Sequence, residues 1–116
     1  MSKTLNDCVI VVGNDGLGQG DEALRHKVLG SYFQTLLELG ELPTAVVFYT
    51  AGVKMVADDS PVLRVLSSIA AEGVALIACR TCLEHYGLME RVAVGRIGNM
   101  MQIVEAQTAA AKVITL

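Results

Sequence analysis

The sequence predicts one α/β domain in which a mostly parallel sheet of about five strands is covered by helices on both faces. Short apolar segments alternate along the chain with segments of helical periodicity, as in βαβ units. Hydrophobic residues make up 53% of the sequence but aromatic residues only 4%, so aliphatic side chains must fill the core of a buried sheet. A chain of 116 residues has the usual size of one domain, and we expect a single domain over residues 1–116.

The first strand is expected at residues 8–12, a continuous apolar run of the kind that is buried on both faces of a sheet. The loop 13–20 contains four glycines and leads to Asp21 and Glu22, whose charges favour a helix start. That helix should run to about Leu39. Its apolar side chains form two adjacent rows at helical spacing, the first made of Leu24, Val28, Tyr32 and Leu36 and the second of Leu29, Phe33 and Leu37. So wide an apolar stripe favours an interface between copies of the chain.

A second strand and a turn are expected after this helix. Gly40 and Pro43 should end the helix, because neither residue continues it. The apolar residues 45–49 then predict the strand, which enters a polar and glycine-containing turn at 50–52.

The second half of the chain begins with a helix whose start is marked by Ser60 as N-cap and Pro61 as first helical residue. Residues 74–78 predict the third strand, which leads directly to Cys79. Residues 81–84 match a capping box, so a short helix should begin at or beside the thiols.

The last elements predicted are a strand, a helix and a strand. Residues 91–95 have the composition of a short fourth strand, and residues 99–102 form a second box-like helix start. The final strand is expected at 112–116. Right-handed crossovers should join the parallel strands.

Composition and charge exclude several classes of partner. The net charge is only −3 and the chain has no run of Lys or Arg, so we expect neither nucleic acid nor a membrane surface as a partner. Residues 1–8 lead into an apolar stretch that is too short for a signal peptide or a membrane span, which favours a cytoplasmic protein. Its three cysteines, Cys8, Cys79 and Cys82, should therefore be reduced.

A site is expected where the carboxyl ends of the parallel strands meet, because loops and helix starts converge there. The segments at that edge are 13–20, 50–52, 79–82 and 95–99, and all are rich in small or polar residues. Candidate binding residues in or next to these segments are Gly16, Gly18, Gly52, Arg80, Thr81, His85 and Asn99. The loop 13–20 lacks the spacing of dinucleotide-binding and P-loop motifs, so its glycines are more simply explained by tight turning.

Cys79 and Cys82 are the candidate catalytic residues. A thiol at a helix start has a lowered pKa, because the positive end of the helix dipole stabilises the thiolate, and Arg80 should add to this effect. Persulfide or disulfide exchange needs such a nucleophile. His85 lies three residues further along the same helix and is a candidate base for Cys82, but the commoner reading of such a residue is a solvated or packed histidine.

Other interpretations of the cysteines remain open. Both thiols would also fit a core as small apolar side chains, which is the reading we adopt for Cys8. A zinc site needs four ligands, and Cys79, Cys82 and His85 supply three at most, so we expect no metal and no other cofactor. His26, in the middle of the first helix, is assigned no role.

Several stretches of the chain occur in the order typical of a known family. They are residues 15–22, 41–43, 48–49, 52–54, 79–86, 93–95, 99–100 and Ile103. With these stretches the chain resembles the DsrE/F-like proteins, and most closely the C-terminal domain of the YedF-type members, which are sulfurtransferase-like proteins associated with selenium metabolism.

The resemblance implies a three-layer α/β/α sandwich that assembles into a homo-oligomer, a dimer, trimer or hexamer. It implies that Cys79 carries sulfur as a persulfide, with Gly87 eight positions later, and that Cys82 resolves the persulfide or holds the loop. A TusA-like sulfur carrier, or another persulfide donor or acceptor, is the implied partner. The TusA-like domain of YedF-type proteins has no counterpart in this sequence, so either a separate carrier protein replaces it or the function has drifted. The chain departs from the family at Arg80, where glycine is usual, and at Met101, where tyrosine is usual.

The leading functional hypothesis is therefore a sulfur-relay protein, with a link to selenium, in which Cys79 accepts sulfane sulfur and passes it to a partner thiol. One alternative is a non-catalytic oligomeric domain that binds a ligand or a protein. The other is a redox switch that forms a disulfide between Cys79 and Cys82.

Overall fold

A five-stranded parallel sheet forms the middle layer of the molecule. The computed structural model describes residues 4–116. The N-terminal segment was expected above not to be a targeting signal, and its first three residues lie outside the described residues. The strands are β1 (Thr4–Val12), β2 (Glu41–Phe48), β3 (Ala75–Cys79), β4 (Arg96–Gly98) and β5 (Lys112–Thr115). Their order is β4-β3-β2-β1-β5, and each of the four pairings is parallel.

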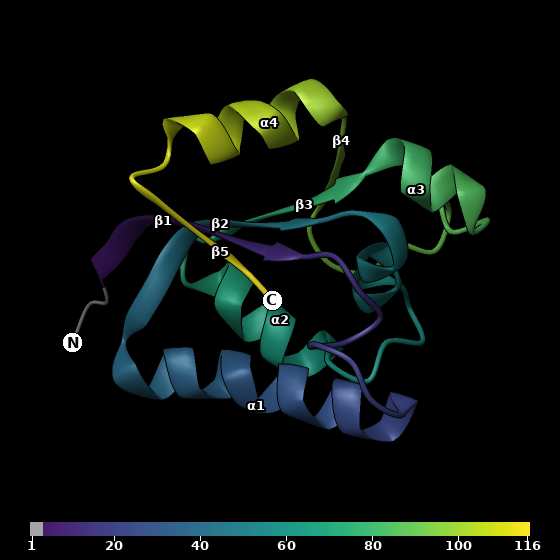
Figure 1. Ribbon diagram of the computed structural model, residues 1–116, viewed down its shortest axis with the longest axis horizontal. Helices are drawn as coiled ribbons and strands as arrows, with labels where there is room; N and C mark the ends of the chain where they lie inside the picture. Colours follow the sequence, from purple (N-terminus) through teal and green to yellow (C-terminus); the bar gives the residue numbers. More distant parts are fainter. Residues whose placement is uncertain (1–3) are drawn as a thin grey trace.

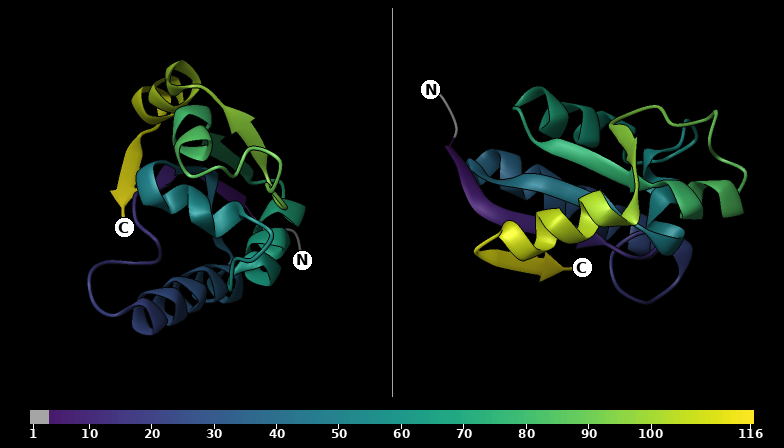
Figure 2. Two further views of the ribbon diagram at one scale, coloured as in Figure 1. Left: turned by 90° about the vertical axis from the view of Figure 1, so that its right-hand side faces the viewer. Right: turned by 90° about the horizontal axis from the view of Figure 1, so that it is seen from above.

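Helices lie on both faces of this sheet, which confirms the predicted three-layer α/β/α sandwich. The helices α1 (Glu22–Leu39) and α2 (Leu63–Ala71) cover one face, and α4 (Met100–Ala109) covers the other (Figures 1 and 2). The short helix α3 (Arg80–His85) and the 3₁₀ helix η1 (Thr50–Val56) both lie beyond the carboxyl ends of the strands. The core between the layers is mainly aliphatic, as predicted; its other buried side chains are Phe33, Phe48, Met55, Cys8 and Cys79.

The boundaries of α1 and the start of α4 follow the local sequence. The Asp21 carboxylate accepts the N–H of Leu24, and Gly40 ends α1 with a left-handed φ of 70°. At α4 the capping box is confirmed, because the Asn99 side chain accepts the N–H of Gln102 at 2.9 Å and the Gln102 side chain accepts the N–H of Asn99 at 3.0 Å.

Two predicted helix caps are wrong, although α3 does begin beside the thiols, as expected. Ser60 does not cap α2, which begins at Leu63; its hydroxyl oxygen accepts the N–H of Val62 at 3.2 Å and so closes a turn before the helix. Thr81 does not begin a capping box either. The chain passes directly from β3 into α3, so Cys79 is the N-cap, without a side-chain hydrogen bond, and Thr81 lies inside the helix.

The predicted strand at 91–95 is also wrong, and β4 begins only at Arg96. Residues 91–95 are instead held against the segment that follows η1. The N–H of Ala93 donates to the carbonyl of Val56 at 2.8 Å, and the N–H of Asp58 donates to the carbonyl of Arg91 at 2.8 Å. Nonlocal backbone pairing of this kind has no periodic signature in the sequence.

β2 and the turn after it differ in extent from the prediction. β2 starts at Glu41 and includes Pro43, which is tolerated because the pairing of β2 with β3 begins only at Ala45. The turn expected at 50–52 continues as η1 to Val56. The strand predicted at 112–116 is present as β5, where the backbone of residue 116 still donates to the carbonyl of Val11.

Candidate functional site

The two candidate thiols lie at the junction of β3 and α3. Cys79 is the last residue of β3, where it pairs with Gly98 of β4, and it is only 2% exposed. Cys82 is one turn further along, half-buried, on the same side of α3. The structure therefore brings the two sulfurs together and leaves Cys82 as the more accessible one.

A backbone amide of η1 contacts the second thiol. The N–H of Thr50 donates to the Cys82 sulfur at 3.0 Å, although the two residues are 32 positions apart. The hydroxyl of Thr50 lies 2.7 Å from the carbonyls of both Gly13 and Tyr49. The Cys82 sulfur thus lies where the ends of β1 and β2 meet α3.

The environment of Cys82 raises the pKa of its thiol. Burial is the largest cause, followed by the hydrogen bond with Cys79, in which the Cys82 thiol keeps its proton. The N–H of Thr50 acts in the opposite direction and lowers the pKa, because it donates to the sulfur. The expectation of a lowered pKa is therefore wrong for Cys82, since burial and the neighbouring thiol outweigh the stabilisation of a thiolate by the dipole of a six-residue helix.

Two other predicted residues adjoin the thiols. Gly52 packs against β1 two residues after Thr50, and a Cβ at this position would lie 2.0 Å from the carbonyl oxygen of Val12. Asn99 follows Gly98, the strand partner of Cys79, but its side chain is engaged in the cap of α4. Both residues build the site rather than offer free groups to it.

The remaining predicted residues of α3 face solvent. Arg80 and Thr81 are exposed in its first turn. His85 is exposed at its last position, and its ring packs edge-on against Tyr86 at 4.9 Å between centroids. Gly87 follows with a left-handed φ of 67° and ends the helix.

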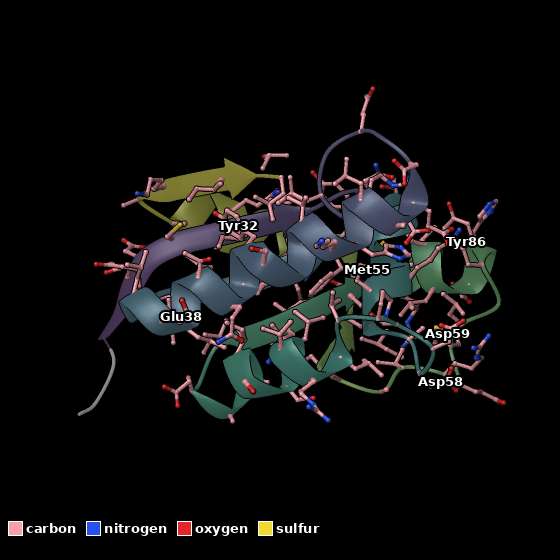
Figure 3. All side chains as sticks on the ribbon, turned by 90° about the horizontal axis from the view of Figure 1, so that it is seen from below. Tyr32, Glu38, Met55, Asp58, Asp59 and Tyr86 are labelled. Carbon is pink, nitrogen blue, oxygen red and sulfur yellow. The ribbon has the colours of Figure 1, made fainter. Side chains whose placement is uncertain are left out.

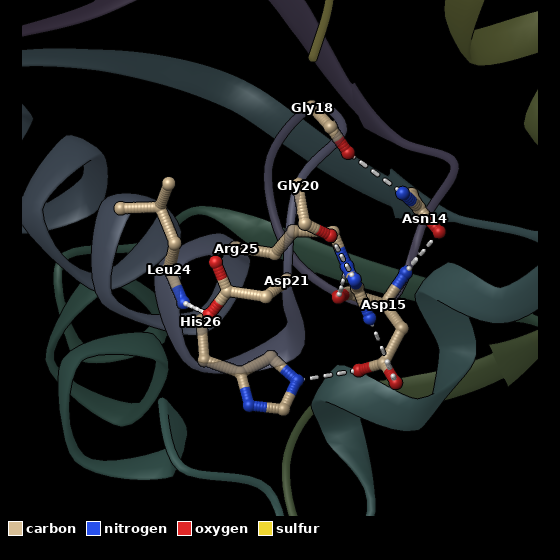
Figure 4. A network of polar contacts seen from close by, with 8 residues as sticks. All are labelled: Asn14, Asp15, Gly18, Gly20, Asp21, Leu24, Arg25 and His26. Carbon is tan, nitrogen blue, oxygen red and sulfur yellow. Dashed lines mark hydrogen bonds and ion pairs between the residues drawn. The ribbon is translucent and has the colours of Figure 1, made fainter.

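Gly16 and Gly18 lie at a different part of the carboxyl edge of the sheet, in the loop 13–20, which packs against α1. Gly16 packs on the backbone of Arg25, and the carbonyl of Gly18 accepts the side chain of Asn14 at 2.7 Å. The loop 13–20 is fixed by a polar network (Figure 4), in which the Nε of Arg25 donates to the carbonyl of Asp15 at 2.9 Å. The structure does not bring these two glycines to the thiols.

His26 is a residue that the sequence reasoning missed. Its Nε2 lies 2.7 Å from Oδ1 of Asp15, so the two side chains form a carboxylate-imidazole pair (Figure 4). The pair joins α1 to the loop after β1 across eleven residues. No local pattern could have predicted it, because it depends on how the loop folds back on the helix.

A half-open cavity of about 460 Å³ lies beside this pair, between the start of α1, η1 and the segments that follow η1 and α3. Three of the residues that line it, Met55, Asp59 and Tyr86, are labelled in Figure 3. Its lining consists of Asp15, Glu22, His26, Lys54, Met55, Asp59, Ser60, Pro61, Tyr86 and Leu88. The ammonium of Lys54 lies over the Tyr86 ring, 4.5 Å from its centroid. Cys79 and Cys82 do not line this cavity.

Within residues 4–116, no three or more His, Cys, Asp or Glu side chains are grouped so that they would hold a metal ion. Over the same residues, no helix has the length and apolar character needed to cross a bilayer.

Comparison with known proteins gives both a family and a fold. The family model described as DsrE/DsrF-like matches residues 9–116. Among solved structures, the YchN protein of E. coli aligns with a TM-score of 0.69 at 19% identity and covers 100% of both chains. A protein of unknown function from Methanobacterium thermoautotrophicum aligns with a TM-score of 0.69 at 25% identity, over 94% of this chain and 97% of its own. Another from Bacteroides thetaiotaomicron gives 0.68 at 18% identity, over 95% of each chain. No curated protein matches the chain.

Proposed function

The chain belongs to the DsrE/DsrF-like family, which is associated with sulfur relay, and we propose that it carries sulfane sulfur as a persulfide on Cys79 and passes it to a partner thiol. The observation that carries the proposal is the thiol pair at the carboxyl edge of the sheet. Cys79 ends β3 and Cys82 stands one helical turn away, so two sulfurs are held within reach of each other at a strand-to-helix junction.

The proposed transfer is a pair of exchange reactions without net oxidation. The Cys79 thiolate attacks the terminal sulfur of a donor persulfide; a sulfur-sulfur bond forms, the donor's own sulfur-sulfur bond breaks, and the donor leaves as a thiolate. An acceptor thiolate then attacks the terminal sulfur on Cys79 in the same way and leaves Cys79 as a thiolate. No redox cofactor is needed, because each step exchanges one sulfur-sulfur bond for another.

Cys82 is proposed as the first acceptor. Cys79 is almost completely buried, whereas Cys82 is half-buried, so a sulfur moved from Cys79 to Cys82 becomes more accessible to a protein partner. The step has the same balance, with Cys82 as the attacking thiolate and Cys79 as the leaving thiolate.

A TusA-like carrier is the proposed protein partner, in a reducing cytoplasm that keeps the thiols free. Its docking surface would include Met100 and Met101, which are 49% and 70% exposed. These side chains begin α4 directly after Gly98 and Asn99, and Gly98 is the strand partner of Cys79. Apolar side chains exposed so close to the thiols support contact with another protein.

A homo-oligomer is proposed through the uncovered side of α1. The Leu29 and Phe33 row of this helix is buried, while Leu24 and Val28 of the adjacent row are 51% and 39% exposed. Val28→Lys should therefore shift the protein to a smaller species in size-exclusion chromatography with light scattering. Gln34→Lys, at an exposed position of the same helix, is the matched control. A wild type that is monomeric at every concentration contradicts this part of the proposal.

Mass spectrometry after incubation with a sulfane-sulfur donor tests the function directly. Trypsin places Cys8, Cys79 and Cys82 in three separate peptides, residues 4–25, 65–80 and 81–91. We expect an added sulfur on the 65–80 or the 81–91 peptide of the wild type, on the 65–80 peptide of Cys82→Ala, and none on Cys79→Ala. Cys8→Ala, which removes a buried thiol of β1, should load normally. Absence of any adduct, where a known carrier is loaded, contradicts the proposal. Parallel incubation with a selenium donor distinguishes the two cargoes by mass.

The cavity supports one second candidate, a binding domain whose ligand does not react with the thiols. Its lining residues Asp15, Lys54 and Tyr86 come from segments that follow β1, β2 and β3, and parallel α/β folds bind ligands beyond these carboxyl ends. Under this alternative, a ligand found by thermal shift would still bind Cys79→Ala/Cys82→Ala and would lose affinity in Lys54→Ala.

The redox switch, the other alternative, has a different signature in mass spectrometry. Oxidation would join the 65–80 and 81–91 peptides by a disulfide without any added sulfur.

A further inference from the structure

Thr50 has an unusual backbone conformation for its residue type. Its φ is 48°, and within residues 4–116 it is the one residue other than glycine with a positive φ. A β-branched side chain is strained in this left-handed region, which glycine or asparagine would occupy at lower cost. Strain of this kind persists where the surrounding structure imposes it, and it often occurs at functional sites.

Three contacts hold Thr50 in this conformation. Its hydroxyl lies 2.7 Å from the carbonyls of Gly13 and Tyr49, which directly follow β1 and β2. The N–H of Gly52 donates to the carbonyl of Tyr49 at 3.0 Å and closes the turn around Thr50. The consequence is that the Thr50 N–H faces the Cys82 sulfur, at 3.0 Å, instead of a backbone carbonyl.

We propose that Thr50 is a positioning residue for the thiol pair, whose strained backbone holds its amide N–H against Cys82 so that this sulfur can bear negative charge. The inference deepens the proposed function, on which its role in sulfur transfer rests. When the Cys82 thiolate attacks the terminal sulfur on Cys79, a bond forms to Cys82 and the electron pair of the broken sulfur-sulfur bond stays on Cys79. The fixed N–H of Thr50 donates a hydrogen bond to the Cys82 sulfur and so stabilises the thiolate that makes this attack.

The N–H of Thr50 lowers the pKa of Cys82, whereas the other groups that shift this pKa raise it. Burial and the Cys79 thiol both raise the pKa of Cys82, and the Thr50 N–H lowers it. The other charged or titratable groups on the elements packed around it are Lys54 on η1 and Arg80, Glu84 and His85 on α3 itself, and none of these shifts the pKa of Cys82. Loss of the N–H contact should therefore leave Cys82 protonated over a wider pH range.

The experiment is site-resolved alkylation of the full-length protein with iodoacetamide between pH 6 and 11. The alkylation of Cys82 is read on the 81–91 peptide, and that of Cys79 on the 65–80 peptide of the same digest. Thr50→Val keeps the shape of the side chain but removes the hydroxyl that holds the strained backbone. Thr50→Ser keeps the hydroxyl and is the conservative rescue, and Thr50→Gly keeps the left-handed backbone and its N–H without strain.

We expect the alkylation midpoint of Cys82 to rise by about one pH unit in Thr50→Val, which is the usual effect of one hydrogen bond to a charged group. The rate at neutral pH should fall only about three- to fourfold, because a thiolate of higher pKa is more nucleophilic. Thr50→Ser and Thr50→Gly should keep the wild-type midpoint. If Thr50→Val does not fold, Thr50→Ala takes its place, with the same expected rise.

Equal midpoints in the wild type and in a folded Thr50→Val or Thr50→Ala overturn the proposal, as does a rise of the same size in Thr50→Ser. The readout is thiolate formation, which needs no sulfur donor. Failure of sulfur loading in the wild type therefore refutes the proposed function and leaves the alkylation result on Thr50 to be judged separately.

Discussion

Replacement of Gly52 by alanine is expected to destabilise the protein and to disturb the contact at Cys82. Gly52 lies in η1 against the end of β1, where a Cβ would stand 2.0 Å from the carbonyl oxygen of Val12 and 2.7 Å from its carbonyl carbon. Real Cβ contacts are essentially never shorter than 3.0 Å, so the two backbones would have to separate by about 1.0 Å, the difference between 3.0 and 2.0 Å.

The cost follows from what that separation breaks. The Val12 carbonyl also accepts the N–H of Tyr49 at 3.2 Å, so moving η1 away stretches a hydrogen bond that joins β1 to the residue before Thr50. Overpacking costs about 1–3 kcal/mol where side chains can adjust, and backbone atoms cannot rotate away, so we expect about 3 kcal/mol for Gly52→Ala. This corresponds to a fall in Tm of roughly 10 °C for a domain of this size.

Urea denaturation followed by circular dichroism measures the loss, with Gly30→Ala as the matched control. Gly30 lies in α1, where a Cβ would meet only a methyl group of Val62 at 3.6 Å. Alanine is favoured over glycine in a helix, so Gly30→Ala should be neutral or more stable by up to about 1 kcal/mol. If Gly52→Ala unfolds at the same urea concentration as Gly30→Ala, and alkylation of Cys82 is unchanged, the assignment of a close backbone contact at Gly52 is refuted.

Three further outcomes are expected. Asn99→Ala should cost about 1 kcal/mol in urea denaturation, because it removes the side-chain acceptor that caps α4; a loss below about 0.5 kcal/mol, the low end for measured caps, would contradict the capping-box assignment. Cys79→Ala should lower the pKa of Cys82 toward its ordinary value, since the thiol contact that raises it is lost while burial stays, and alkylation of the 81–91 peptide at pH 8 should become faster; an unchanged rate would argue against the contact. The hydrogen bond from Arg91 holds the pKa of the Asp58 carboxyl below its usual range, so its contribution to stability is present above the unfolded-state pKa near 4 and is lost as the pH falls through the lower folded-state pKa. In Arg91→Gln, NMR titration should find the Asp58 carboxyl near its ordinary pKa, and a titration identical to the wild type would refute the pairing.

The fold and the thiol pair were largely predictable from the sequence. Continuous apolar runs predicted the second half of β1, the centre of β2 and β3 as buried strands, because a parallel sheet excludes water from both of its faces; β1 begins four residues earlier than expected, at Thr4. The motif of Cys79 and Cys82 was expected at the end of a strand, and β3 does end at Cys79. Local chemistry also predicted the cap of α4 and the end of α1 at Gly40, since these depend on neighbours in the chain.

The wrong predictions and the missed residues have the same cause, which is contact between segments that are distant in the sequence. Ser60 and Thr81 carry sound capping sequences, but the path of the chain into each helix determined where it starts, and Ser60 closes a turn instead. The segment 91–95 has the composition of a strand, yet its backbone pairs with the residues after η1. In each case a contact between distant segments outweighed a local preference of about 1 kcal/mol.

The sequence by itself determined the layers of this protein, the order of its elements and the presence of two thiols at the edge of the sheet. Only the tertiary structure decided which sulfur is buried and which is accessible, what opposes ionisation of Cys82, and that the Thr50 amide faces it. The physical reason is the distance along the chain over which each interaction acts. Apolar periodicity and capping act within one or two turns of chain, whereas the burial, hydrogen bonds and pKa of Cys82 depend on η1, which is brought to α3 from 32 residues away.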